Sequence, residues 1–197
     1  ILKDISFRVE PGETVALVGP TGSGKTSITA LLHRFYDVWG GQVMIGGHDV
    51  RDITQASLGR DVAMVLQEPY LFSGPIADNI RYAKADATRA DIIAAAKAVG
   101  AHGFIMRLRD GYDTVLDQGG ANLSLGQRQL LSFARALVAD ARILVLDEAT
   151  ANVDSHTELE IQRALARLLK GRTAVVIAHR LATIRGADRI IVLEDGR

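Results

Sequence analysis

The chain has 197 residues, of which 48% are hydrophobic and 23% charged, the average makeup of a folded globular protein. Its 23 Lys and Arg balance its 23 Asp and Glu, which argues against a general nucleic-acid binder with a basic excess. There are no cysteines, so disulfide scaffolds, thiolate metal sites and thiol nucleophiles are excluded. No apolar run approaches the roughly 20 residues of a membrane span, and the first residues do not predict a signal peptide.

The local sequence pattern is interrupted at both ends of the sequence. Ile1 begins within a strand-like pattern, and Arg197 directly follows the turn-like Glu194-Asp195-Gly196. We therefore expect the chain to be a fragment of a longer polypeptide.

In chain order, the first third of the sequence predicts strands separated by turns, with one helix among them. Short apolar or alternating runs favour strands, and glycine or proline between them favours tight turns. The predicted elements are an antiparallel hairpin of strands 5–9 and 14–18 around Pro11-Gly12, a helix over 25–35, a second short hairpin around 42–45 with Gly46-Gly47, and a buried strand over 62–66.

The middle of the chain is alanine-rich and helical, and strands return after it. The predicted elements are helices over 91–99 and 127–138, strands over 143–146, 173–178 and 190–193, and an amphipathic helix over 158–170. Strands that alternate with helices predict an α/β fold with a mainly parallel sheet and, here, N-terminal antiparallel hairpins. The expected domains are a core of residues 1–69 and 140–197 and an inserted α-helical lobe of residues 70–139.

A glycine-rich loop follows the strand over 14–18 and fits the P-loop (Walker A) pattern G-x-x-x-x-G-K-[ST] in full. Glycine lets backbone N–H groups turn toward phosphate oxygens, and the next helix start adds positive charge. Lys25 is predicted to reach the β- and γ-phosphates, and the Thr26 hydroxyl to bind Mg²⁺. An ordinary glycine-rich turn is the alternative, which the strand before the loop and the helix after it disfavour. The predicted nucleotide-binding residues are Gly19, Pro20, Thr21, Gly22, Ser23, Gly24, Lys25, Thr26 and Ser27.

Polar side chains follow three further apolar runs, at the edge where open α/β sheets bind ligands. These residues are Gln67, Asp147 with Glu148, and His179. Asp147 is predicted to hold Mg²⁺, and Glu148 to accept a proton from the attacking water or to orient it. Gln67 is predicted to contact Mg²⁺ or water, and His179 the γ-phosphate. Each residue alone is more often an ordinary solvated or core residue, so these predictions depend on the P-loop upstream.

A second helix start, around Ser124, has the features of an anion site. Ser124 and Gln127 have the spacing of a capping box, which is the simpler interpretation. A serine hydroxyl and the backbone of Gly126 at a helix N-terminus also suit an anion. One ATP cannot occupy two distant helix starts of one domain. We therefore predict a dimer in which Ser124, Gly126 and Gln127 cover the nucleotide of a partner.

Taken in order along nearly the whole chain, these motifs resemble those of the ATP-binding cassette (ABC) nucleotide-binding domain. The motifs that look like Walker A, Q-loop, signature, Walker B and switch histidine are residues 19–26, Gln67, residues 123–127, residues 143–148 and His179. The resemblance implies a P-loop NTPase core, ATP and Mg²⁺, and a head-to-tail dimer with two ATP molecules between P-loop and signature. It also implies that Asp154 crosses the dimer interface. Leu125, where the signature usually has glycine, and Gln118, where exporters usually carry glutamate, depart from the pattern.

Residues 67–80 look like the exporter branch of this family. That resemblance implies ATP hydrolysis coupled to export, no nucleic acid, and a place on the cytoplasmic side of the cell membrane. The implied partners are a second nucleotide-binding domain, in a homo- or heterodimer, and transmembrane domains contacted by the helical lobe. One alternative is a soluble ABC-class ATPase of DNA repair or translation, which the compact spacing and the lack of cysteines disfavour. Another is a cassette that binds ATP without hydrolysing it, which Glu148 and His179 disfavour.

Overall fold

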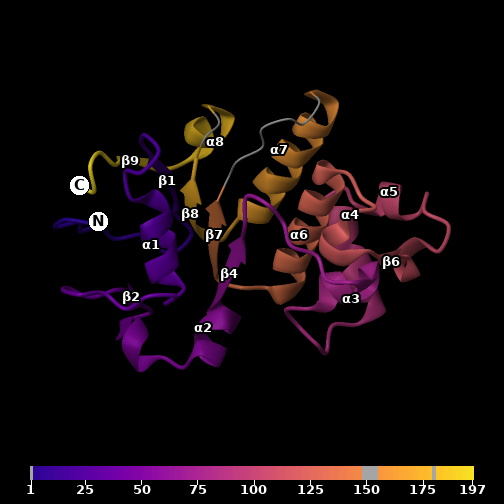
Figure 1. Ribbon diagram of the computed structural model, residues 1–197, viewed down its shortest axis with the longest axis horizontal. Coiled ribbons are helices and arrows are strands. Elements are labelled where there is room, and N and C mark those ends of the chain that lie inside the picture. The colour runs from indigo at the N-terminus through magenta and orange to yellow at the C-terminus, as the bar shows by residue number, and fades with distance from the viewer. Residues whose placement is uncertain (1, 148–154, 179–180) are drawn as a thin grey trace. The chain divides into compact units, whose positions relative to one another are not determined.

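The structure is a computed structural model that describes residues 2–147, 155–178 and 181–197 (Figure 1). The chain divides into two compact units. The sheet unit holds the described residues of Ile1–Met64, Arg142–Glu148 and Gly171–Arg197, and the helical unit those of Val65–Ala141 and Ala149–Lys170. The predicted site residues Glu148, Asp154 and His179 lie outside the described residues.

The sheet unit is built on strands that alternate with short helices. Its strands are β1 (Thr14–Val18), β2 (Met44–Ile45), β3 (His48–Asp49), β4 (Val62–Val65, ending in the helical unit), β7 (Ile143–Asp147), β8 (Thr173–Ile177) and β9 (Arg189–Val192). Its helices are α1 (Lys25–Leu32), the 3₁₀ helix η1 (Val50–Asp52), α2 (Gln55–Asp61) and α8 (Leu181–Gly186).

Five of the described strands form one sheet in the order β4-β7-β8-β1-β9 (Figure 1). β1 pairs in parallel with β8 on one side and with β9 on the other, and β7 pairs in parallel with β8. The middle strands β1, β7 and β8 are almost wholly buried, as expected for apolar runs covered on both faces. The predicted α/β fold with a mainly parallel sheet is confirmed, and the antiparallel pair β2–β3 confirms the second predicted hairpin.

The first predicted hairpin is wrong. Residues 5–9 form no strand, although Ile5, Phe7 and Val9 are partly buried against the core and alternate with exposed residues. Because β8 and β9 pair with the two edges of β1, neither edge accepts an antiparallel partner from this segment. The alternation of apolar and polar residues over 5–9 therefore arises because one face of this segment is half-buried, and not because the segment forms a hydrogen-bonded hairpin.

An apolar core attaches α1 to the sheet. Ile28 of α1 belongs to one buried cluster with residues of β1 and β8 and with Leu193, which follows β9. Burying an isoleucine side chain contributes about 1.5–3 kcal/mol. A second cluster joins Val50, Leu58 and Val62 to Val145 of β7. The segment between β1 and α1 is therefore anchored in the core at both of its ends.

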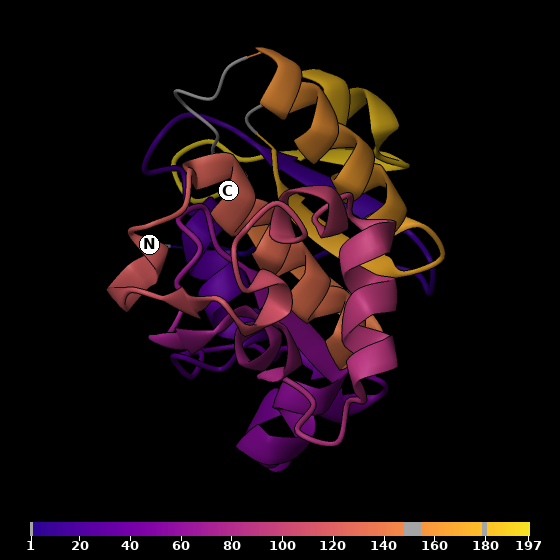
Figure 2. The same ribbon diagram turned by 90° about the vertical axis from the view of Figure 1, so that its right-hand side faces the viewer.

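The helical unit is organised around α6, which packs against α3, α4 and α7 (Figure 2). Its elements are β5 (Gly74–Pro75), α3 (Ile76–Arg81), α4 (Arg89–Ala98), α5 (His102–Ile105), η2 (Gly111–Asp113), β6 (Val115–Leu116), η3 (Gln118–Gly120), α6 (Leu125–Ala139) and α7 (Ser155–Leu169). The three predicted helices in this part of the chain correspond to α4, α6 and α7. Across residues 2–147, 155–178 and 181–197, every helix falls short of the length or hydropathy that a membrane span requires.

Candidate phosphate-binding site

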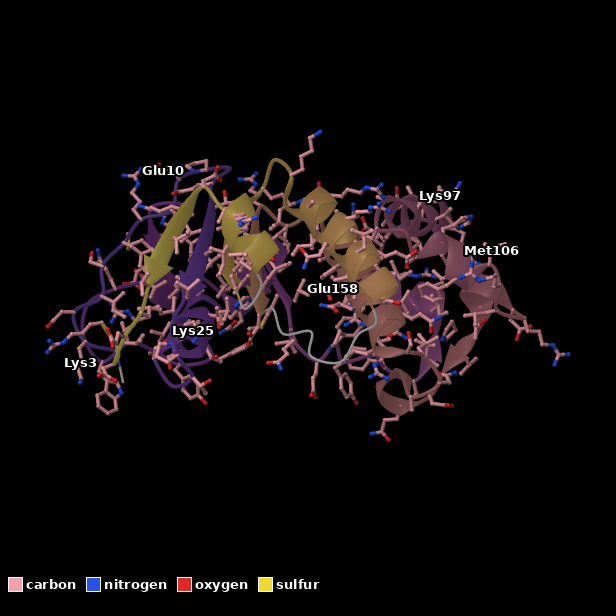
Figure 3. The ribbon with its side chains drawn as sticks, turned by 90° about the horizontal axis from the view of Figure 1, so that it is seen from above. Lys3, Glu10, Lys25, Lys97, Met106 and Glu158 are labelled. Carbon is pink, nitrogen blue, oxygen red and sulfur yellow. The ribbon has the colours of Figure 1, made fainter. Side chains whose placement is uncertain are left out.

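The glycine-rich loop connects β1 directly to α1, whose first residue is Lys25 (Figure 3). Gly19 and Gly24 have φ values of 151° and 108°, which L side chains rarely adopt. A Cβ at Gly19 would lie 2.1 Å from the carbonyl oxygen of Leu193, and one at Gly24 would lie 2.5 Å from Cδ2 of Leu2. The path of the backbone therefore requires glycine at both ends of the loop, and the backbone oxygen of Leu193 also excludes a Cβ at Gly19.

The side chain of Lys25 folds back over the loop and is buried. Its Nζ donates to the backbone oxygens of Gly19 and Pro20, each at 2.8 Å, and lies 3.4 Å from Oγ of Ser23. The backbone N–H of Ser23 donates to the oxygen of Pro20 at 3.2 Å, which closes the turn. Lys25 thus ties the loop to the helix start and places a cation within the loop.

The N-terminus of α1 is suited to an anion. Within the described residues no side chain caps this helix, and Gly24 at the N-cap is in the left-handed conformation. The first N–H groups of a helix have no intrahelical acceptors and carry the positive end of the helix dipole. Backbone donors and the Lys25 ammonium therefore come together in one element, which is the chemistry that phosphate groups require.

Asp147, the last residue of β7, lies at the same edge of the sheet as the loop. Leu17 of β1 and Asp147 are both in register with Ile177 of β8, the strand between them. Adjacent strands are about 4.8 Å apart, so the backbones of Leu17 and Asp147 are separated by roughly 10 Å. Thr26, exposed in the first turn of α1, and Asp147 offer the oxygen ligands that Mg²⁺ prefers. This donor set fits a magnesium ion bound together with phosphates.

The predicted capping box at the start of α6 is present in the helical unit. Oγ of Ser124 accepts a hydrogen bond from the backbone N of Gln127 at 3.2 Å, and Oε1 of Gln127 accepts one from the backbone N of Ser124 at 3.0 Å. Ser124 is exposed. Because its oxygen accepts in this bond, the hydroxyl hydrogen can still be donated to a ligand.

Gly126 has a packing role that sequence patterns did not indicate. It is buried in the first turn of α6, and a Cβ there would lie 2.2 Å from Cγ2 of Thr157 in α7. Real Cβ atoms essentially never come so close to another heavy atom. The close approach of α6 and α7 therefore requires glycine at this position, whatever ligand the helix start binds.

The sheet unit brings the predicted residues 19–27 together with Asp147. Gln67, exposed just after β4, belongs to the helical unit together with Ser124, Gly126 and Gln127. The roles assigned to these residues stay predictions, as do those of the predicted site residues outside the described ranges.

An exposed aromatic group surrounds Arg135 of α6 in the helical unit. Arg135 donates to the backbone oxygen of Asn79 at 2.9 Å, to that of Tyr70 at 3.0 Å, and to Oδ1 of Asn79 at 3.1 Å. Its guanidinium lies 5.7 Å from the ring centroid of Phe72 and 5.5 Å from that of Tyr82. The residues Tyr70, Phe72 and Tyr82 are 51%, 38% and 62% exposed. Exposed aromatic rings held in fixed positions suit a protein partner.

Comparison with known proteins places these features in a family. The family model described as ABC transporter matches residues 2–151. The uncharacterized ABC transporter ATP-binding proteins YfiC and YknV of Bacillus subtilis are 53% and 54% identical over 99% and 100% of the chain. The ATP-dependent lipid A-core flippase of Syntrophus aciditrophicus is 50% identical over 100% of the chain. The chain spans 32%, 32% and 33% of the length of these relatives, respectively.

Proposed function

Because the chain belongs to the ABC transporter family, whose ATP-binding domains hydrolyse ATP, we propose that it is the ATP-hydrolysing domain of an exporter. The observation that carries this proposal is the loop at the start of α1, with the buried Lys25 ammonium on its backbone oxygens. The three relatives described above are named as transporter ATP-binding proteins or as an ATP-dependent flippase. These names favour transport over a soluble ATPase of DNA repair or translation.

In the proposed mechanism, the phosphates of ATP lie on the backbone N–H groups of residues 19–27, and Lys25 pairs with the β- and γ-phosphates. Thr26, Asp147 and Gln67 would hold Mg²⁺, which would neutralise phosphate charge there. Glu148 orients the attacking water and accepts its proton. His179 contacts the γ-phosphate.

We propose that Ser124, Gly126, Gln127 and Asp154 act on the nucleotide of a second nucleotide-binding domain. The exposed hydroxyl of Ser124 retains a hydrogen to donate, and it lies at the positive end of α6. A γ-phosphate bound by two domains holds them together, and its loss on hydrolysis lets them separate. The partner is a second copy of this domain or a sister domain, arranged head to tail.

We further propose a P-loop core of residues 1–69 and 140–197, a signature-bearing lobe of residues 70–139, and attachment to the cytoplasmic side of a membrane. The division of the chain into two compact units supports a core and a lobe, but it groups α7 with the helical unit and not with the sheet unit. The relatives are about three times as long as the chain, which leaves room for transmembrane domains in those proteins. The exposed rings around Arg135 are the surface of the lobe that we assign to such a partner.

The substitution Glu148→Gln in the full-length protein tests the proposed mechanism. A glutamine cannot accept the proton, so we expect ATP binding to persist, turnover to stop and an ATP-dependent dimer to accumulate. Steady-state hydrolysis, equilibrium ATP binding and molecular mass in solution report these three properties. Glu160→Gln, at an exposed position of α7, is the matched control and should behave as the unaltered protein. Normal hydrolysis by the Glu148→Gln protein would show that Glu148 is not the base.

A further inference from the structure

The four residues that follow β9, here called the 193–196 segment, lie against the phosphate loop. The backbone N–H of Leu193 donates to the oxygen of Val18, the last residue of β1, at 2.8 Å. The carbonyl oxygen of Leu193 lies directly beside Gly19, where a Cβ would come within 2.1 Å of it. The first end of the loop is therefore in contact with the first residue of the 193–196 segment.

The last residue of the segment, Gly196, holds the other end of the loop. Its backbone N–H donates to the oxygen of Ser23 at 3.2 Å, and its own oxygen accepts from the N–H of Lys3 at 2.7 Å. Leu2 fills the space beside Gly24, and Cα of Gly196 lies 3.9 Å from where a Cβ of Gly24 would be. Figure 3 labels Lys3 and Lys25, which mark the N-terminal segment and the loop.

The hydrogen bond to Ser23 also fixes the direction of the next amide. In a trans peptide the C=O of one residue and the N–H of the following residue point in opposite directions. No described peptide bond is cis. Because the oxygen of Ser23 points to Gly196, the N–H of Gly24 points away from the 193–196 segment. Gly24 N–H is one of the donors that the phosphate-binding loop offers to an anion.

We propose that Gly196 is a positioning residue for ATP: it holds the Ser23 carbonyl so that the loop is already ordered when the phosphates arrive. This inference rests on the proposed function, namely ATP at the loop. A loop ordered in advance loses less conformational freedom on binding, and the apparent affinity rises with the fraction of molecules in the competent conformation. Gly196 acts through Ser23 and Gly24 and touches no reacting atom.

The chain offers a closely matched control for a substitution at Gly196. Gly196 and Gly12 have φ values of 81° and 80°, so an alanine meets the same backbone strain at both positions. Both residues also use their N–H as a donor, and Gly12 donates to Oγ1 of Thr173 at 2.9 Å. The difference is that Gly196 holds the phosphate loop and Gly12 does not.

In the full-length protein, Gly196→Ala should weaken equilibrium ATP binding by roughly 3- to 10-fold, and Gly12→Ala should change it by less than about twofold. Both variants should lose similar stability to urea. At saturating ATP the turnover of the Gly196→Ala protein should be unchanged, so that the effect falls on KM and not on kcat. Hydrogen exchange of the amides of residues 19–24 without nucleotide should accelerate in Gly196→Ala alone.

A second pair of variants tests the same positioning without strain at a glycine. Leu2→Ala removes the side chain beside Gly24, whereas Ile5→Ala removes a similar one that packs against the same core cluster. Leu2→Ala should weaken ATP binding more than Ile5→Ala does. Equal effects within each pair, or unchanged ATP binding in Gly196→Ala, would overturn the positioning role. Failure of the unaltered protein to bind ATP would overturn the proposed function together with it.

Discussion

Helices α1 and α6 both begin beside a glycine, but among the described residues a side chain caps only α6. At α1, Gly24 is left-handed, no described side chain caps the helix, and the buried Lys25 lies over the loop. At α6, Ser124 is extended and forms a reciprocal capping box with Gln127. The start of α1 leaves its backbone donors to a ligand, whereas the start of α6 satisfies two of its own. The first has the donors that an anion site requires, and the second is a complete helix start to which we propose that a ligand contact is added.

The glycines at the two helix starts are required for different reasons. Gly24 is needed because of its φ of 108°, and the tip of the Leu2 side chain lies where its Cβ would be. Gly126 is helical and is needed because Thr157 of α7 lies beside it. One glycine serves the path of a loop and the other serves the packing of two helices. A glycine in a motif therefore does not by itself indicate contact with a ligand.

The largest effect should come from Lys25→Ala, which removes the cation from the start of α1. We expect ATP hydrolysis to fall by at least about 100-fold, because the phosphates lose their positive partner and the loop loses its internal tie. Steady-state hydrolysis and equilibrium ATP binding measure the loss. Lys97→Ala, at an exposed position of α4, should leave both unchanged. Near-normal hydrolysis by Lys25→Ala would contradict the proposal that the start of α1 binds the phosphates.

The next effect concerns Gly126. Alanine there must push Thr157 aside, so we expect Gly126→Ala to lower the free energy of unfolding by about 2 kcal/mol. Serine at position 157 lacks the Cγ2 methyl, so the double variant with Thr157→Ser should regain most of that stability, as measured in a double-mutant cycle with denaturant. If hydrolysis returns with stability, Gly126 serves packing alone. Hydrolysis that stays low in the stable double variant would mean that Gly126 also serves the ligand.

The third prediction separates the cap of α6 from its proposed ligand contact. Ser124→Ala and Thr88→Ala each remove the N-cap of a capping box, at α6 and at α4, and each should cost about 1 kcal/mol of stability. Hydrolysis by the full-length protein should fall by about tenfold or more in Ser124→Ala alone, since Ser124 is proposed to bind phosphate and Thr88 is not. Equal hydrolysis by the two variants would show that Ser124 only caps α6 and does not bind phosphate.

The smallest effect concerns the far end of α1, where His33 follows the last turn. Burial of the ring lowers the pKa of His33 below 6.5, and a hydrogen bond from Nδ1 to the Thr29 oxygen offsets part of this. The unfolded chain therefore binds the proton more readily. Stability should be full above pH 6.5 and should decrease as the pH falls from 6.5 toward the lowered pKa. Denaturation midpoints across this range should decline less in His33→Gln; an equal decline would exclude His33 as the cause.

Much of the fold could be predicted because the middle strands are buried on both faces. The run over residues 14–18 matches β1 to the residue, since its apolar side chains meet turn residues at both ends. The failure at residues 5–9 has a different origin. Local alternation reports which side chains face the core, but the partners of β1 come from the other end of the chain.

The position of the loop between β1 and α1 could be predicted because its pattern lies in eight consecutive residues. Neither Gly196 nor Thr157 could be found in this way. Gly196 looks like an ordinary turn glycine, and its contact with Ser23 joins residues from opposite ends of the chain. The reason for Gly126 likewise lies on another helix, in a threonine with no distinguishing local pattern. Contacts between distant segments leave no periodicity or spacing in the sequence.

The position of β1 between β8 and β9 also bears on how the protein is made. Within this chain a ribosome synthesises β1 and the loop before β8 and β9, the strands that flank β1. Pairings between such distant segments form slowly, because a long stretch of chain must be closed first. The loop therefore stays without its flanking strands until residues 173–192 have been synthesised.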